Sequence, residues 1–201
     1  TTQILQEKWG NHPKVKILHR ENRSGFKGAA LNNALQFMDK RTDYVVIFDA
    51  DFVPYPDTLN LFAKYFAVIG KNEFSNIINP AEAFANAVAK PYQITSSYAA
   101  ESYRGKTVAV QGYQWHVLNK SENWITRAVR SEFAGSYIIE RSGAQLFSLL
   151  KQIAGSVYAI NASVLKNVGW GTSITEDFQL TLNLYEKGFK VAYTPYIQAP
   201  S

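Results

Sequence analysis

A short apolar run followed by two acidic residues constrains the fold of this chain more than any other feature. The run from Val45 to Phe48 is rich in β-branched side chains, and Asp49 and Asp51 follow it directly. Such a run predicts a strand that is buried on both faces, which is typical of a parallel sheet. Because ligands of open α/β sheets bind outside the carboxyl ends of the strands, the two acidic residues are predicted to face a binding site.

The carboxylates of Asp49 and Asp51 offer hard oxygen ligands for a divalent cation. Such a cation needs further ligands, which substrate phosphates commonly supply. The alternative for an isolated Asp-x-Asp is a polar turn that leaves a strand. Both interpretations are consistent with this segment alone.

The composition is that of a folded globular chain, with 46% hydrophobic and 18% charged residues. A length of 201 residues suffices for one domain, or for one domain with an insertion. The net charge of +5 suits a phosphate-bearing ligand or an acidic membrane surface, but the basic residues are scattered, so no nucleic-acid partner is predicted. The absence of cysteine excludes disulfides and cysteine-based metal sites. No apolar run is long enough to span a membrane, so a soluble, cytosol-facing chain is expected.

Hydrophobic periodicity and turn residues predict alternating strands and helices. A strand at Val15–Leu18, a helix at Lys27–Asp39 and the strand at Val45 predict a βαβ unit with a right-handed crossover. Residues 70–106 have a weaker pattern, with one helix signal, and are interpreted as an insertion in a single domain, residues 1–201. The other predicted elements are helices at Thr2–Trp9, Asp57–Val68 and Ala162–Val168, a largely helical stretch at Tyr113–Leu150, and strands at Thr107–Val110, Ser156–Ile160 and Lys190–Thr194.

The helix at Lys27 is predicted to begin in a polar, glycine-flanked segment, Arg23–Gly28. Backbone amides at a helix start beside a strand end can hold an anion, and Lys27 adds a positive charge there. The alternative is an ordinary loop with a solvated lysine.

A second acidic segment, Thr175-Glu176-Asp177, opens a helix that ends before Gly188. Its predicted apolar stripe is Phe178, Leu182 and Tyr185. Ser173 and Glu176 have the spacing of a capping box, so a purely structural role is the alternative to a functional one.

Taken together, these segments resemble the family 2 glycosyltransferases, which use nucleotide-diphosphate sugars and include the processive cellulose and mannan synthases. The order and spacing of the segments across Pro13–Pro195 make the resemblance specific. It implies polysaccharide biosynthesis and a GT-A-like α/β fold with a mostly parallel sheet flanked by helices. The segments are Arg23–Asn32, Asp49-Ala50-Asp51, Val110-Gln111, Gly155-Ser156 and Gly169–Pro195 with its Thr175-Glu176-Asp177.

The resemblance also implies roles for individual residues. Lys27, Asp49 and Asp51 correspond to residues that bind the nucleotide sugar, and Asp49 and Asp51 to those that hold Mg²⁺ or Mn²⁺. Asp177 corresponds to the general base of the inverting enzymes, which takes the proton of the acceptor hydroxyl. A UDP-sugar is the expected donor.

A glycan or a lipid is the acceptor that the resemblance implies. Trp170 is expected to stack on an acceptor sugar, with a core tryptophan as the alternative, and Glu176 is expected to lie at the acceptor site.

The chain departs from the family pattern at both ends. Family members have two strands upstream, which hold the nucleotide base, and a Gln-x-x-Arg-Trp motif with membrane helices downstream. This chain is therefore expected to be part of a longer protein at the cytoplasmic face of a membrane, with which it associates through segments that this chain lacks. If nothing else completes the sheet, we expect an exposed sheet edge, weak nucleotide binding and little activity of the isolated chain.

Two other functions stay open. Asp49-x-Asp51 after an apolar strand also resembles the opening motif of haloacid-dehalogenase-type phosphatases, in which the first aspartate is a nucleophile. That family requires a later acidic pair at a strand end, whereas Glu176-Asp177 opens a predicted helix. The other function is that of a degenerate transferase domain acting as a non-catalytic binding module, which donor hydrolysis would distinguish from an enzyme.

Overall fold

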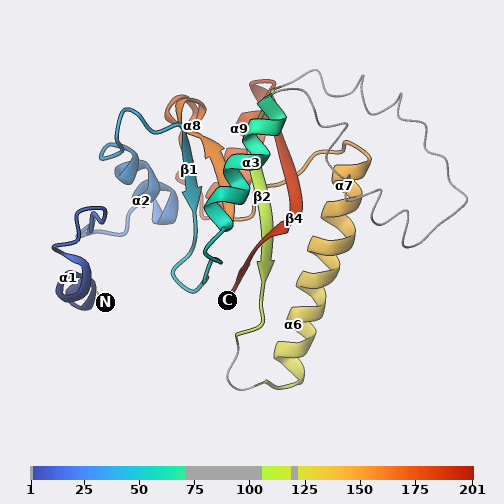
Figure 1. The fold of residues 1–201 in the computed structure, drawn as a ribbon, viewed down its shortest axis with the longest axis horizontal. Coiled ribbons are helices and arrows are strands. Elements are labelled where there is room, and N and C mark those ends of the chain that lie inside the picture. The colour runs from blue at the N-terminus through green and yellow to red at the C-terminus, as the bar shows by residue number, and fades with distance from the viewer. Residues whose placement is uncertain (1, 71–105, 119–121) are drawn as a thin grey trace, which may run out of the picture.

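Four strands form one mixed sheet in the computed structural model, which describes residues 2–70, 106–118 and 122–201 (Figure 1). The strand order is β1-β3-β2-β4, in which β2 and β4 are parallel and β3 is antiparallel to both of its neighbours. The α/β class is confirmed, whereas the prediction of a mostly parallel sheet is wrong for the strands described. The strands are β1 (Tyr44–Ile47), β2 (Thr107–Trp115), β3 (Tyr158–Asn161) and β4 (Lys190–Pro200).

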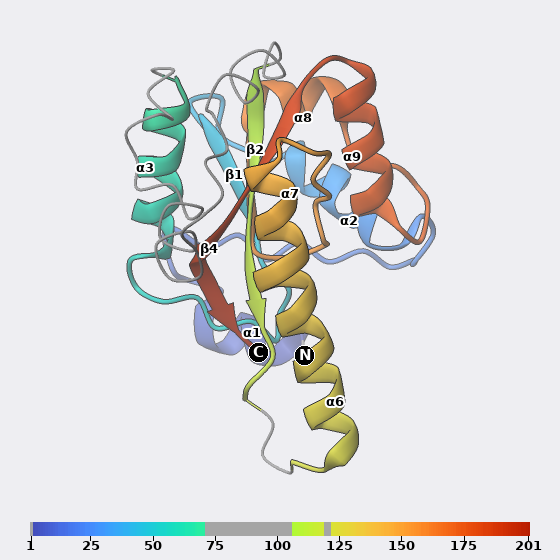
Figure 2. The same cartoon turned by 90° about the vertical axis from the view of Figure 1, so that its right-hand side faces the viewer.

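Helices lie on both faces of this sheet. Figure 2 shows α3 on one side of the strands and α2, α8 and α9 on the other. α6, a π-helix η1 and α7 follow one another along the chain and form one rod. Among the described residues, no helix has the length and apolar character needed to cross a bilayer. The helices are α1 (Thr2–Trp9), α2 (Phe26–Leu35), α3 (Thr58–Gly70), α6 (Trp124–Ala134), η1 (Gly135–Arg141), α7 (Ser142–Leu146), α8 (Ala162–Val168) and α9 (Glu176–Glu186).

Alternate side chains of the strands pack against these two helical layers. Ile160 of β3 is buried with Leu180 of α9 on one face of the sheet. Its neighbour Ala159 is buried with Phe62 and Phe66 of α3 on the other face. Burying a large apolar side chain contributes about 1.5–3 kcal/mol relative to leaving it exposed. The two cores therefore fix the sheet together with the helices that cover its two faces.

The apolar run at Val45 forms β1, but its pairing differs from the prediction. Val45 and Val46 pack toward opposite cores, as expected of a strand covered on both faces. However, β1 pairs antiparallel with β3, and Tyr44 at its start is 40% exposed. β1 is also a terminal strand of the sheet within the described residues, and exposure of its edge stays a prediction. An apolar run indicates burial, but it does not indicate strand direction.

The predicted βαβ unit is not formed, because Val15–Leu18 is not a strand. Val15 and Leu18 are 37% and 41% exposed, and the segment pairs with no strand in the described residues. Lys16 Nζ instead donates a hydrogen bond to the Phe37 carbonyl (3.0 Å). A strand requires a neighbour for its backbone groups, and no such neighbour follows from the apolar pattern of this segment alone.

Most predicted helices are present with shifted ends. α1 and α8 match the predicted bounds, and α2 begins one residue earlier than predicted. Residues 113–115, which were predicted to be helical, belong to β2. The predicted apolar stripe of α9 is wrong for Phe178 and Leu182, which are exposed, whereas Tyr185 packs against the core together with the buried Leu180 and Leu184. The predicted insertion, residues 70–106, lies almost entirely outside the described residues. The helix that was predicted within it also lies outside them.

Candidate active site

Lys27 is the centre of a polar cluster built from four separate segments. Its ammonium group forms an ion pair with Asp49, which directly follows the β1 run. It also donates a hydrogen bond to the Gly155 carbonyl (2.7 Å), and it lies 3.8 Å from Oε1 of Glu176 at the start of α9. The structure thus brings together three of the residues that the sequence singled out, with Lys27 of α2 between the residue that follows β1 and the first turn of α9.

Asp177 lies beside the same cluster. A Cβ atom placed on Gly155 would be 3.4 Å from Oδ2 of Asp177 and 3.7 Å from Nζ of Lys27. Gly155 has a φ of 66°, a left-handed conformation that glycine adopts without strain. The absence of a side chain at this position therefore leaves open the space between the lysine and the half-buried carboxylate of Asp177.

The capping-box alternative for the second acidic segment is wrong. The residue that precedes α9 is Thr175, and no side chain caps the helix. Ser173 Oγ accepts a hydrogen bond from the Thr175 amide (3.3 Å) instead of one from Glu176. Burial raises the pKa of Glu176, which the positive charge of Lys27 partly opposes. The two carboxylates thus do not form a capping box with Ser173, although Asp177 Oδ1 accepts a hydrogen bond from the Phe178 amide in the first turn (2.7 Å).

Asp51 lies apart from Lys27. It is exposed and acts on His116: burial lowers the pKa of His116, and the negative charge of Asp51 opposes this effect. The Phe52 ring is 5.8 Å from the His116 ring, and His116 Nδ1 is 2.7 Å from Ser201 Oγ. The two aspartates of the motif therefore face different neighbours.

Asp49 and Asp51 have the donor chemistry that suits Mg²⁺ or Mn²⁺, which prefer carboxylate oxygens. Within residues 2–70, 106–118 and 122–201, no three His, Cys, Asp or Glu side chains are grouped to hold a metal. A cation at this position would therefore depend on water and on substrate phosphates for its other ligands. The residues fit a cation that arrives with its substrate.

The loop that carries Gly155 is held by two buried glutamines of β2. Gln111 is fully buried; its Nε2 donates to the Ser156 carbonyl (2.9 Å), and its Oε1 accepts from the Ala154 amide (2.9 Å). Gln114 Nε2 donates to the same Ser156 carbonyl (2.9 Å). Neither amide has a role that the sequence alone predicts, although a polar residue inside a buried strand is a signal for such a link.

The same loop connects the two acidic segments. Ser156 Oγ accepts a hydrogen bond from the Asp49 amide (2.8 Å). Thr181 Oγ1 accepts from the Ile153 amide (3.0 Å) and donates to the Asp177 carbonyl (2.8 Å). The loop therefore fixes the distance between the end of β1 and the first turn of α9.

Gln111→Leu is expected to lower the free energy of unfolding by about 1–3 kcal/mol, because the Ala154 amide loses its acceptor and the Ser156 carbonyl keeps only Gln114 as a side-chain donor. Chemical denaturation followed by circular dichroism measures this change. Gln36→Leu is the matched control, since Gln36 is exposed. Equal stability of the two variants would show that the Gln111 amide does not hold the loop.

The π-helix η1 adds Tyr137 to the surroundings of Asp177, which sequence reasoning missed. Burial raises the pKa of Tyr137 to about 12, an effect that nearby Arg141 opposes and Asp177 reinforces. The guanidinium of Arg141 lies 4.5 Å from the centre of the Tyr137 ring, and its Nη1 donates to the Gln152 carbonyl (2.7 Å). π-helical turns are frequent at functional sites, and this one packs an aromatic residue toward the carboxylate.

Trp170 belongs to the hydrophobic core. It is 5% exposed, and its Nε1 donates to the Tyr158 hydroxyl (2.8 Å). Asn32 clamps its backbone, since Asn32 Nδ2 donates to the Trp170 carbonyl (2.7 Å) and Oδ1 accepts from the Trp170 amide (3.0 Å). The burial favours the alternative of a core tryptophan over stacking on a sugar.

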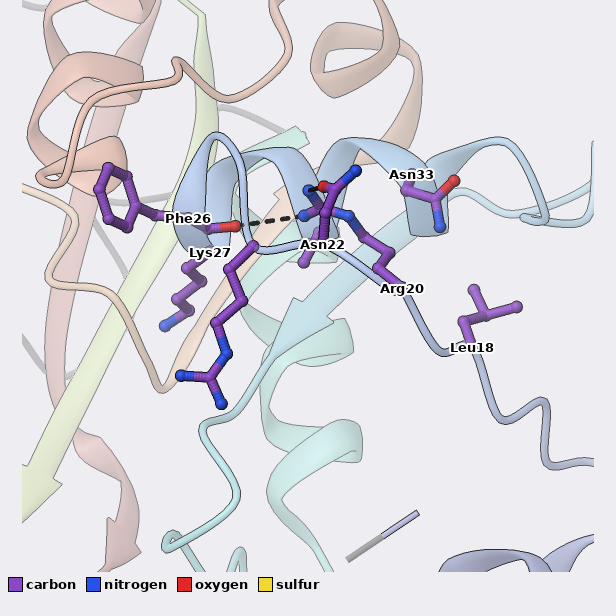
Figure 3. A pocket seen from close by; sticks show the side chains of 8 residues that line it. Leu18, Arg20, Asn22, Phe26, Lys27 and Asn33 are labelled. Carbon is purple, nitrogen blue, oxygen red and sulfur yellow. Dashed lines mark hydrogen bonds between the residues drawn. The ribbon is translucent and has the colours of Figure 1, made fainter.

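A hollow of about 380 Å³ lies beside α2 (Figure 3). Arg20 donates hydrogen bonds to the Phe26 and Ser24 carbonyls and so shapes the turn before α2. Three cationic side chains line the hollow, and one of them, Lys27, also belongs to the polar cluster. The lining residues are Leu18, Arg20, Asn22, Arg23, Phe26, Lys27, Ala30 and Asn33.

Comparison with known proteins identifies relatives of this chain. The glucomannan 4-beta-mannosyltransferase 7 of Arabidopsis thaliana is 27% identical over 187 residues, which make up 90% of this chain and 27% of the relative. The probable glucomannan 4-beta-mannosyltransferase 3 of Oryza sativa subsp. japonica is 26% identical over 197 residues, 96% of this chain and 29% of the relative. The chain thus spans less than a third of these relatives' length.

A family model described as "Glycosyltransferase like family 2" matches residues 1–199, nearly the whole chain. The polar cluster around Lys27 and the first turn of α9 both lie within that match. The chain therefore belongs to the glycosyltransferase-like family 2.

Proposed function

We propose that this domain transfers a sugar from a nucleotide-diphosphate sugar to a hydroxyl group of an acceptor, with inversion at the anomeric carbon. Membership of the family implies a GT-A fold, a nucleotide-sugar donor and a glycan acceptor. The observation that carries the proposal is the convergence of Lys27, Asp49 and Asp177 around Gly155. This reaction needs a positive charge that binds the phosphates of the donor, which Lys27 offers. It also needs a carboxylate that accepts the proton of the acceptor hydroxyl, which Asp177 offers.

The donor side of the site is formed by Lys27, Asp49 and Asp51. The ammonium group of Lys27 is a positive charge that suits the diphosphate of the donor. Asp49 is 42% exposed and Asp51 is exposed, so both can be reached by a ligand. Mg²⁺ or Mn²⁺ held by these two carboxylates would neutralise charge on the departing diphosphate.

Asp177 is the proposed general base. It lies in the first turn of α9, the end of a helix at which acidic side chains are favoured. Its Oδ1 accepts a hydrogen bond from the Phe178 amide (2.7 Å), whereas Oδ2 faces the space beside Gly155. A hydroxyl that reaches this space can lose its proton to Oδ2 while its oxygen attacks the anomeric carbon, and one such displacement inverts the configuration.

The names of the relatives favour a glycan over a lipid as acceptor and a mannosyl group as the transferred sugar. They do not name the nucleotide of the donor. UDP remains our expectation, and GDP is tested beside it. Association with the cytoplasmic face of a membrane, through segments outside this chain, is part of the proposal.

Isothermal titration of UDP and GDP, with and without Mn²⁺, tests the donor side. The polypeptide that carries this sequence is expected to bind one nucleotide in a metal-dependent manner, and Asp51→Asn is expected to weaken binding about tenfold or more, which corresponds to about 1.4 kcal/mol. Asp57→Asn, a nearby exposed aspartate, is the matched control. Metal-dependent binding that Asp51→Asn leaves unchanged would contradict the assignment.

The rival functions have their own tests. In a phosphatase Asp49 would act as a nucleophile, and that family requires an acidic pair at a strand end, whereas Glu176-Asp177 opens a helix. Phosphatase activity that disappears in Asp49→Asn would favour that reading. Nucleotide binding without any donor hydrolysis would favour a non-catalytic binding module.

A further inference from the structure

Glu176 is a buried carboxylate that the proposed reaction does not use. Its side chain is only 8% exposed, so an acceptor sugar has little access to it. Acidic side chains are rarely buried unless they are paired. The cation that Glu176 faces is Lys27, 3.8 Å away. The burial of Glu176 therefore disfavours the predicted contact with an acceptor sugar and favours a contact with Lys27.

The backbone fixes the distance between these two residues. Gly28, next to Lys27, packs so closely that an added Cβ would lie 2.0 Å from the Gly171 carbonyl oxygen and 3.1 Å from Cβ of Glu176. The clamp of Asn32 on the Trp170 backbone holds the same two segments together one turn further along α2. The first turn of α2 is thus locked against the turn that leads into α9.

The three polar neighbours of Lys27 differ in access to solvent. An ammonium group has three N–H donors, and here its neighbours are Asp49, the Gly155 carbonyl and Glu176. Asp49 is 42% exposed, whereas Glu176 is at the buried side. A diphosphate that approaches from solvent therefore meets the lysine on the side of Asp49, while Glu176 remains behind it.

We propose that Glu176 is a positioning residue that acts through Lys27: it holds the ammonium group from the buried side, in place for the diphosphate of the donor. A lysine side chain has a long, flexible stem, and a second carboxylate behind the ammonium group limits the positions it can adopt. This inference rests on the proposed function and deepens it.

Glu176→Gln separates positioning from a general charge effect. Removal of a negative charge near an anion site should by itself tighten binding of UDP or GDP, because less repulsion remains. Loss of a positioning contact should instead weaken binding. We expect the dissociation constant and the donor KM to rise about tenfold, with a small change in kcat and no change in the acceptor KM. Glu186→Gln, at the exposed end of the same helix, should behave like wild type.

A double-mutant cycle tests whether the effect passes through Lys27. In a Lys27→Met background, Glu176→Gln is expected to leave the nucleotide dissociation constant unchanged or to lower it slightly, because the group that it positions is absent and only the loss of charge repulsion remains. An equal tenfold weakening in both backgrounds would overturn the inference, as would tighter binding in the single variant. Glu176→Asp keeps the charge and should retain part of the affinity, and it serves as the second variant if Glu176→Gln does not fold.

One measurement does not depend on nucleotide binding. ¹⁵N NMR of the lysine ammonium groups should show Lys27 with slow hydrogen exchange in the wild type and faster exchange in Glu176→Gln, while Glu186→Gln leaves it unchanged. Identical exchange of Lys27 in wild type and Glu176→Gln would overturn the inference. If wild type binds neither UDP nor GDP but this exchange difference is present, the proposed function fails and the role of Glu176 stands.

Discussion

Replacement of Asp177 by Asn is expected to lower the rate of sugar transfer by about 10²–10⁴-fold, the range that positioned proton transfer contributes. The amide oxygen can still accept the hydrogen bond that the Phe178 amide donates to Oδ1, so the helix start is expected to be preserved. What the amide cannot do is take a proton from an acceptor hydroxyl. Because Lys27 and Asp49 are untouched, nucleotide affinity should stay close to that of the wild type.

The measurement is transfer from a nucleotide sugar to a mannan or glucomannan acceptor by the polypeptide that carries this sequence, together with nucleotide titration of the same samples. Glu186→Gln removes an exposed acid from the same helix and is the control. A transfer rate in Asp177→Asn within a few-fold of the wild type would place the base elsewhere. A parallel loss of nucleotide affinity would indicate disruption of the site rather than loss of a base.

Local sequence signals predicted the helices well because their causes are local. α8 begins after Asn161, whose side chain accepts hydrogen bonds from the Ser163 and Val164 amides, and it ends at Gly169 with a φ of 67°. Both features are N-cap and C-terminal signals that can be read from the sequence. The pairing of the strands depends on partners that are distant along the chain. The apolar runs therefore predicted that strands are present. They did not predict that β3 lies between β1 and β2 and is antiparallel to both.

The sequence singled out the charged residues of the candidate site. It did not indicate the residues that hold the loop between them. Lys27, Asp49 and Asp177 are chemically distinctive and lie near one another in the structure, and the roles assigned to them stay predictions. Gln111 and Thr181 hold the loop between them through hydrogen bonds to its backbone. Such contacts depend on a loop path that no local pattern encodes.

Two residues show why residue type alone does not define a role. A tryptophan and a glutamate beside a catalytic segment are common acceptor ligands, yet Trp170 is 5% and Glu176 is 6% exposed. Burial is a property of the packed fold. Trp170 is part of the hydrophobic core, and Glu176 lies on the buried side of Lys27.

Gly28→Ala is the substitution expected to perturb the site most without removing any functional group. In the interior of a free helix, alanine in place of glycine would stabilise by about 1 kcal/mol. Here the added methyl group would lie 2.0 Å from the Gly171 carbonyl oxygen, and that neighbour is backbone, so α2 must shift away from the turn before α9. Overpacking of this kind costs about 1–3 kcal/mol, and the shift would also move Lys27 away from Glu176 and Asp49.

We therefore expect Gly28→Ala to lower the free energy of unfolding and to weaken nucleotide binding at least tenfold, as measured by denaturation and titration. Gly143→Ala in α7 is the matched control, because no atom lies within 4 Å of the Cβ that it would add. The control should be neutral or slightly more stable, so the same chemical change has opposite effects at the two positions. Stabilisation by Gly28→Ala with unchanged nucleotide binding would show that the contact between α2 and the turn before α9 does not determine the position of Lys27.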